Sequence, residues 1–106
     1  MSATDKGNRL HYRRESGSMK VWFRMYRGAK LLKQDVVEDI TKDTRTHKVL
    51  HALEAICHKW NLAEPYWLKK NEQDFLAHAK TRFTKHNFME AVEFDYLEMS
   101  ILEEDD

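Results

Sequence analysis

The strongest constraint on the fold is a helical period in residues 44–60. The main apolar residues of this segment recur at spacings of four, three and four: Val49, Leu53, Ile56 and Trp60. At about 100° per residue, these positions fall on one side of a helix. A helix with one apolar stripe buries that stripe against another layer of the protein. We therefore expect a helix over residues 44–60 that carries the main helical face of the core.

The segment before this helix alternates in polarity and predicts a β-hairpin. Its first strand, residues 20–26, has one apolar face and one basic and aromatic face: Val21, Phe23 and Met25 against Lys20, Trp22, Arg24 and Tyr26. Alternation with a period of two is typical of a strand that is buried on one face. Gly28 permits a tight turn, and residues 31–39 are expected to return as the second strand.

The rest of the chain predicts a second helix and a last strand. We expect a short helix over residues 71–80, mostly loop over 81–88, and a strand over 91–102. The apolar residues of that strand change faces near Tyr96, which predicts either a β-bulge near Tyr96-Leu97 or a strand that is buried on both faces. The order strand, strand, helix, helix, strand predicts an α+β fold, with two helices packed on one face of a small, three-stranded antiparallel sheet.

Length and composition indicate one domain in a reducing compartment. A chain of 106 residues that is 42% hydrophobic and 34% charged is too apolar for general disorder and too polar for a membrane protein. No apolar run approaches the roughly 18 residues of a bilayer span, and no secretion signal is present. The single cysteine, Cys57, excludes an internal disulfide framework. We expect a cytoplasmic protein with no membrane partner.

The formal net charge of zero is a sum of unlike parts. Residues 1–34 carry nine basic and two acidic side chains, whereas residues 87–106 carry eight acidic and no basic ones. Such asymmetry fits terminal segments that pair within one sheet, and it also fits a nucleic-acid arm or an acidic tail.

The first 18 residues show no period of 2 or 3.6, and we predict that they are disordered. Gly17-Ser18 before Met19 fits a cloning scar, while Arg13-Arg14-Glu15 fits a translated ribosome-binding site upstream of the true start. We therefore expect a single domain over residues 19–103 with an acidic tail over 104–106. Without the leader, the net charge is −2.

Two segments, residues 43–48 (DTRTHK) and 80–86 (KTRFTKH), place a Thr-Arg pair among basic residues and suggest an anion site. Cations in the first helical turn oppose the helix dipole, but amides there can hold a phosphate or carboxylate. If the two segments converged, the site would consist of Thr44, Arg45, His47, Arg82 and Lys85. The plainer alternative is that Asp43 caps the helix and Arg45 forms an ion pair with Asp39 or Asp43.

The outer face of the first strand suggests a second surface. Lys20, Trp22, Arg24 and Tyr26 alternate basic and aromatic groups, as on sheets that bind single-stranded nucleic acid. Two features disfavour that interpretation. Glu93 and Asp95 of the last strand could lie opposite the cations and neutralise them, and a domain of net charge −2 lacks the basic field that nucleic-acid affinity needs.

The histidines of the long helix are a weak metal candidate. His47 and His51 form an i, i+4 pair that could bind Zn²⁺, but the histidines and Glu54 along this face span three turns and cannot all reach one ion. We expect a solvated polar face and no metal or cofactor. Cys57 belongs to the apolar stripe and is expected to be a structural thiol rather than a nucleophile.

Four segments carry a resemblance to a small uncharacterised protein family of clostridial-type Firmicutes bacteria. They are residues 19–23 (MKVWF), 43–48, 80–84 with Asn87-Phe88, and 93–98 (EFDYLE). The resemblance covers residues 19–106. It implies a cytoplasmic bacterial protein and supports the fold, but it implies no activity.

No sequence motif supports an enzyme, because no Gly-rich phosphate loop, nucleophile elbow or paired-cysteine motif is present. We expect a non-enzymatic binding or interaction module with a protein partner, or a homodimer formed by edge pairing or helix packing. The alternative is an anion or single-stranded nucleic-acid binding domain that uses the two Thr-Arg segments.

Overall fold

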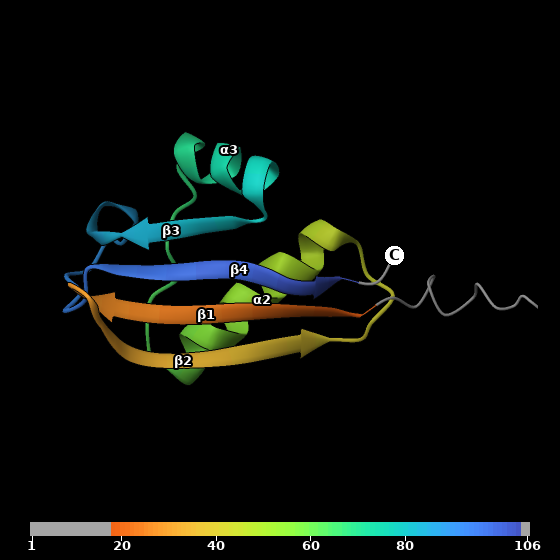
Figure 1. Cartoon of the computed structure of the whole chain (residues 1–106), viewed down its shortest axis with the longest axis horizontal. Coiled ribbons are helices and arrows are strands. Elements are labelled where there is room, and N and C mark those ends of the chain that lie inside the picture. Colours follow the sequence, from red (N-terminus) through yellow and green to blue (C-terminus); the bar gives the residue numbers. More distant parts are fainter. Residues whose placement is uncertain (1–17, 105–106) are drawn as a thin grey trace, which may run out of the picture.

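The computed structural model describes residues 18–104, which form a four-stranded antiparallel sheet and two helices (Figure 1). The elements in chain order are β1 (Met19–Arg27), β2 (Lys30–Asp39), α2 (Arg45–Lys59), α3 (Lys69–His78), β3 (Lys80–Thr84), the 3-10 helix η1 (Lys85–Asn87) and β4 (Tyr96–Glu104). The strands lie in the order β2-β1-β4-β3. The predicted α+β class is therefore confirmed.

β1 and β2 form the hairpin that the alternation predicts. The apolar side chains of β1 are buried on one face, and its other side chains are half-buried on the opposite face. Gly28 has a φ of +59° at the turn, a conformation that glycine adopts without strain. The register shifts between Met25 and Tyr26, which places Tyr26 opposite Leu31.

The long helix α2 has nearly the predicted bounds, with Thr44 and Trp60 as its cap residues. Its apolar stripe is buried, with Val49, Leu53 and Ile56 each less than 5% exposed, and the helix packs on β1 and β2. After Trp60, Asn61 takes a left-handed φ of 55° and turns the chain away. The predicted helix and its core face are confirmed.

After α2, the structure differs from the prediction at α3, at β3 and at the start of β4. α3 starts two residues earlier than predicted, at Lys69, and β3 lies in a segment predicted as loop. The expected three-stranded sheet is therefore wrong, because β3 pairs with β4 and adds a fourth strand. Five alternating residues are too few for a clear period, so hydrogen bonding to β4 decides that Lys80–Thr84 is a strand.

β4 begins at Tyr96 rather than at residue 91. The apolar residues before Tyr96 therefore belong to a loop, and this is why they do not continue the alternation of the strand. Phe94 lies in the loop before β4 and is buried there. Its ring packs edge-on against Phe88, with the ring centroids 5.5 Å apart.

The ladder between β1 and β4 has no register shift near Tyr96, and β4 instead shifts where it meets Lys20 and Val21. The alternative expectation, burial on both faces, holds for Leu97, Glu98 and Met99, which are all buried. Glu104, predicted to begin an acidic tail, is the last residue of β4.

Residues 1–17 and 105–106, and with them nearly all of the predicted disordered leader, lie outside the described residues.

Candidate binding surface

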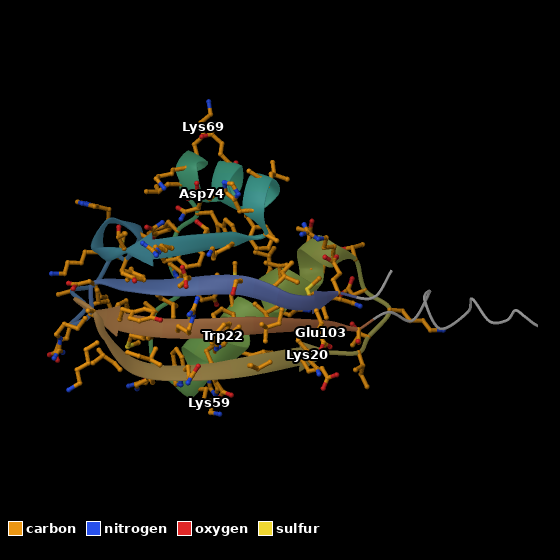
Figure 2. All side chains as sticks on the ribbon, in the orientation of Figure 1. Lys20, Trp22, Lys59, Lys69, Asp74 and Glu103 are labelled. Carbon is orange, nitrogen blue, oxygen red and sulfur yellow. The ribbon has the colours of Figure 1, made fainter. Side chains whose placement is uncertain are left out.

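One face of the sheet carries a layer of aromatic and charged side chains that no described helix covers. α2 lies behind the sheet in Figure 1, and Figure 2 shows Lys20, Trp22 and Glu103 on the side opposite that helix. We name this surface the open face. The pairing of the strands places the following residues on it: Lys20, Trp22, Arg24 and Tyr26 of β1, Tyr96, Glu98 and Glu103 of β4, and Arg82 of β3.

The aromatic rings and guanidinium groups of the open face form one continuous layer. Arg24 lies over the Trp22 ring at 4.0 Å and Arg82 over the Tyr96 ring at 4.4 Å. Tyr26 and Tyr96, opposite one another in the ladder, stack with their ring centroids 5.1 Å apart. Cation–π and stacking contacts of this kind hold the side chains in defined positions.

A buried carboxylate lies at the centre of this layer. Glu98 is only 3% exposed and pairs with Arg24 on β1 and with Arg82 on β3, where Nε lies 3.1 Å from the carboxylate. A buried charge is tolerated only when it is paired and hydrogen-bonded, and here two arginines satisfy it. The three residues lie side by side in the ladder, so the ion-pair cluster joins three strands.

The acidic partners of the β1 cations differ from those expected from the sequence. Glu93 and Asp95 precede β4 and are not opposite Lys20 or Arg24. Glu93 accepts a hydrogen bond from Arg27 through its backbone oxygen, while Asp95 accepts one from the Gly28 amide. In the register of β4 with β1, Glu103 instead lies opposite Lys20 and Glu98 lies opposite Arg24, and each carboxylate forms an ion pair with that cation.

The first Thr-Arg segment forms the start of α2. Thr44, not Asp43, caps α2, since its hydroxyl accepts a hydrogen bond from the His47 amide at 3.2 Å. The Nε atom of Arg45 lies 2.9 Å from the Glu104 carboxylate, so its partner is neither Asp39 nor Asp43. The unusual cation in the first turn is therefore balanced from the end of β4.

The structure does not bring the two Thr-Arg segments together. Arg82 pairs with Glu98 on the open face, whereas Arg45 lies over Phe75 on the helix side and pairs with Glu104. Positions 98 and 104 are about 20 Å apart along a strand. Lys85 begins η1 beyond the end of β3. Thr44, Arg45 and His47 therefore do not share a pocket with Arg82 and Lys85.

A network of buried side-chain amides holds the second Thr-Arg segment, residues 80–86, in place. No sequence pattern described above predicts it. The Asn71 side chain is 3% exposed and donates to the Thr81 hydroxyl and to the Arg82 carbonyl, both at 2.9 Å. Asn87 donates to the Asn71 side chain at 2.7 Å and to the Tyr66 carbonyl at 2.6 Å. The network ties α3, β3, η1 and the preceding loop together, but isolated asparagines give no periodic signal in a sequence.

The histidines of α2 lie on its exposed side. His47 and His51 stack at 6.1 Å, and His47 Nδ1 lies 2.8 Å from Asp43, whose pKa this hydrogen bond lowers. Among residues 18–104, no group of three His, Cys, Asp or Glu side chains is placed to hold a metal ion.

Cys57 is buried in the core, and its burial raises the pKa of the thiol to about 12. At neutral pH it is therefore a protonated thiol, which is a poor nucleophile.

Comparisons of the chain with protein-family models, with curated proteins and with solved structures found no match. The resemblance to a clostridial protein family stays a prediction. Neither α2 nor α3 is long and apolar enough to cross a bilayer.

Proposed function

We propose that the chain is a non-enzymatic interaction module whose open face binds a protein partner. The observation that supports this most strongly is the continuous layer of Trp22, Tyr26, Tyr96, Arg24 and Arg82 on an uncovered sheet face. Tryptophan, tyrosine and arginine are the residues that most often dominate the binding energy of protein interfaces. On this face they are held in place before any partner arrives, which reduces the entropy cost of binding.

The charges of the open face favour a protein over a nucleic acid. Lys20 pairs with Glu103, and Arg24 and Arg82 share Glu98. Nucleic-acid affinity depends mainly on cations that contact phosphates, and these three cations already have carboxylate partners. In addition, guanidinium groups lie over two of the rings on which bases would stack.

Arg82 indicates the chemistry of the partner. Its side chain is 58% exposed, and within the described residues it uses only Nε for hydrogen bonding, with Glu98 as acceptor. Its terminal nitrogens can therefore donate to a carboxylate or carbonyl of the partner. A partner with apolar side chains around one such acceptor would complement the rings and the guanidinium together.

Site-specific photo-cross-linking in cells that naturally express the chain tests this proposal. A photoreactive phenylalanine analogue would replace Trp22 or Tyr26 on the open face, and Tyr66, which is 56% exposed and lies in the loop before α3, would be the matched control. We expect one discrete protein adduct from positions 22 and 26 that the control at position 66 does not give. Equal yields at all three positions, or none, would contradict the proposal.

The nucleic-acid alternative needs its own measurement. Labelled single-stranded oligonucleotides would be titrated with the wild-type chain and with Trp22→Ala at low salt. Binding that weakens with salt and is lost in the variant would support the alternative, because it would assign phosphate contacts and base stacking to the open face. We expect no binding.

A further inference from the structure

A second uncovered apolar surface lies between the two helices. It is a groove with a volume of about 480 Å³, and its walls come from both helices and from the loop before α3: Arg45, Thr46, Val49, Leu50, Trp67, Glu72, Phe75 and Leu76. The groove exists because α2 packs on β1 and β2 while α3 packs on β3, so the helices lie over separate parts of the sheet.

The rim of the groove exposes large apolar side chains. Leu76 of α3 is 82% exposed and Leu50 of α2 is 42% exposed, and both line the groove. The floor includes Phe75, which is 8% exposed and packs edge-on against Trp67. Exposed leucines beside an apolar groove are typical of an interaction site rather than of a solvated surface.

The charges on the two walls indicate what fits the groove. Arg45 lies on the α2 wall and Glu72 on the α3 wall. A partner that carries only positive or only negative charge would therefore be repelled by one of these two residues. Arg45 uses Nε for Glu104, while Glu72 forms no ion pair within residues 18–104. In a two-fold dimer, by contrast, Arg45 of each copy would face Glu72 of the other.

We propose that two copies of the chain form a two-fold homodimer through this groove, with Leu76 of each copy seated in the groove of the other. The protruding leucine and the apolar groove are then complementary. Glu72 gains a cationic partner, because Arg45 uses Nε for Glu104 and its terminal nitrogens can donate to Glu72 of the other copy. The groove lies on the helix side of the sheet, so dimerisation leaves both open faces accessible. The homodimer therefore presents two copies of the proposed protein-binding surface and can bind a repeated partner with avidity.

Sedimentation velocity of the full chain over a wide range of concentration tests the dimer. We expect a concentration-dependent dimer for the wild type and a monomer for Leu76→Asp, with unchanged circular dichroism. Met89→Asp is the matched control, because Met89 is 78% exposed and does not line the groove. A monomeric wild type at every concentration, or a Leu76→Asp variant that dimerises as the wild type does, would overturn the proposal.

A charge exchange tests the two-fold arrangement itself. Glu72→Arg alone should weaken dimerisation at least tenfold, because it places two cations together. The added changes Arg45→Glu and Glu104→Arg, which keep an ion pair between positions 45 and 104, should restore most of the loss. Failure of this triple variant to recover would contradict the pairing of Arg45 with Glu72. Trp22→Ala should leave the dimer constant unchanged; loss of the dimer in this variant would assign self-association to the open face instead, and would overturn the groove.

Discussion

The two halves of residues 19–95 contribute to one apolar core but differ in the further interactions that hold them. Residues 19–60, which contain the hairpin and α2, are held by an apolar layer in which Phe23, Leu53 and Ile56 are almost fully buried. Residues 61–95, which contain α3, β3 and η1, depend on the buried amides of Asn71 and Asn87 in addition to a few aromatic rings. Apolar contacts tolerate small shifts, whereas hydrogen bonds require defined geometry, so the two halves should fail in different ways.

The largest expected effect is the loss of a core side chain in the first half. Leu53→Ala should lower the free energy of unfolding by roughly 2–5 kcal/mol, because Leu53 is 2% exposed and its removal leaves a cavity. Urea denaturation followed by circular dichroism measures the change. Leu102→Ala is the control, since Leu102 is 48% exposed and should change the stability by much less. Similar losses in both variants would show that the apolar layer does not hold this half.

A smaller and more local effect is expected from the amide network of the second half. Asn71→Ala should cost roughly 1–3 kcal/mol, because it removes an acceptor from Asn87 and a donor to Thr81 in a buried site. Hydrogen exchange should accelerate in α3 and β3 while the amides of α2 keep their protection.

Gln73→Ala, on the exposed side of α3, is the control for Asn71→Ala. If exchange instead accelerated equally throughout the sheet and both helices, the two halves would not be distinct units.

The helix cap of the first half should contribute less than either of these. Thr44→Ala removes the hydroxyl that accepts from the His47 amide, and we expect a loss of about 1 kcal/mol. Thr46→Ala, in the first turn of the same helix, leaves the cap intact. Thermal or urea denaturation that ranks the two variants equally would argue against Thr44 as the cap.

The smallest effect is expected from acid, and it should be concentrated in the first half. Hydrogen bonds lower the pKa of Asp35, Asp39 and Asp43, whereas in the second half Asp74 is the affected carboxyl. A lowered folded pKa means that the stabilisation is complete above the ordinary value near 4 and is lost as the pH falls through the folded value.

Denaturation midpoints measured from pH 7 down to about pH 3 should therefore fall, and less so in Asp35→Asn, which lacks the contact with Lys59. An identical pH dependence in Asp35→Asn and the wild type would mean that the ion pair between β2 and α2 contributes nothing in solution.

The first half, which has periodic apolar residues, is predicted well from the sequence, whereas the second half, which depends on individual hydrogen bonds and on strand pairing, is not. The apolar stripe of α2 and the alternation of β1 are periodic, and periods can be counted along a chain. β3 has only five residues, and it is a strand because β4 lies beside it. The apolar pattern predicts too early a start for β4, because Phe94 is apolar and buried but lies in a loop.

The candidate surface was predicted in part for a related reason. Trp22, Arg24 and Tyr26 follow from the alternation of β1 alone, and the structure places them on the open face. Tyr96 and Arg82 join them only through the register of β4 and β3, which depends on partners far along the chain. Arg24 and Glu98 are 74 positions apart, and no local pattern links them.

The pairing of β1 with β4 would also allow the chain to be circularly permuted. Met19, at the start of β1, lies opposite Glu104, at the end of β4, and such partners are about 5 Å apart. A short turn could join these two positions and leave every strand in its place. New ends opened at the exposed turn around Gly28 would then give a circular permutant with the same sheet, in which the hairpin is no longer a local contact.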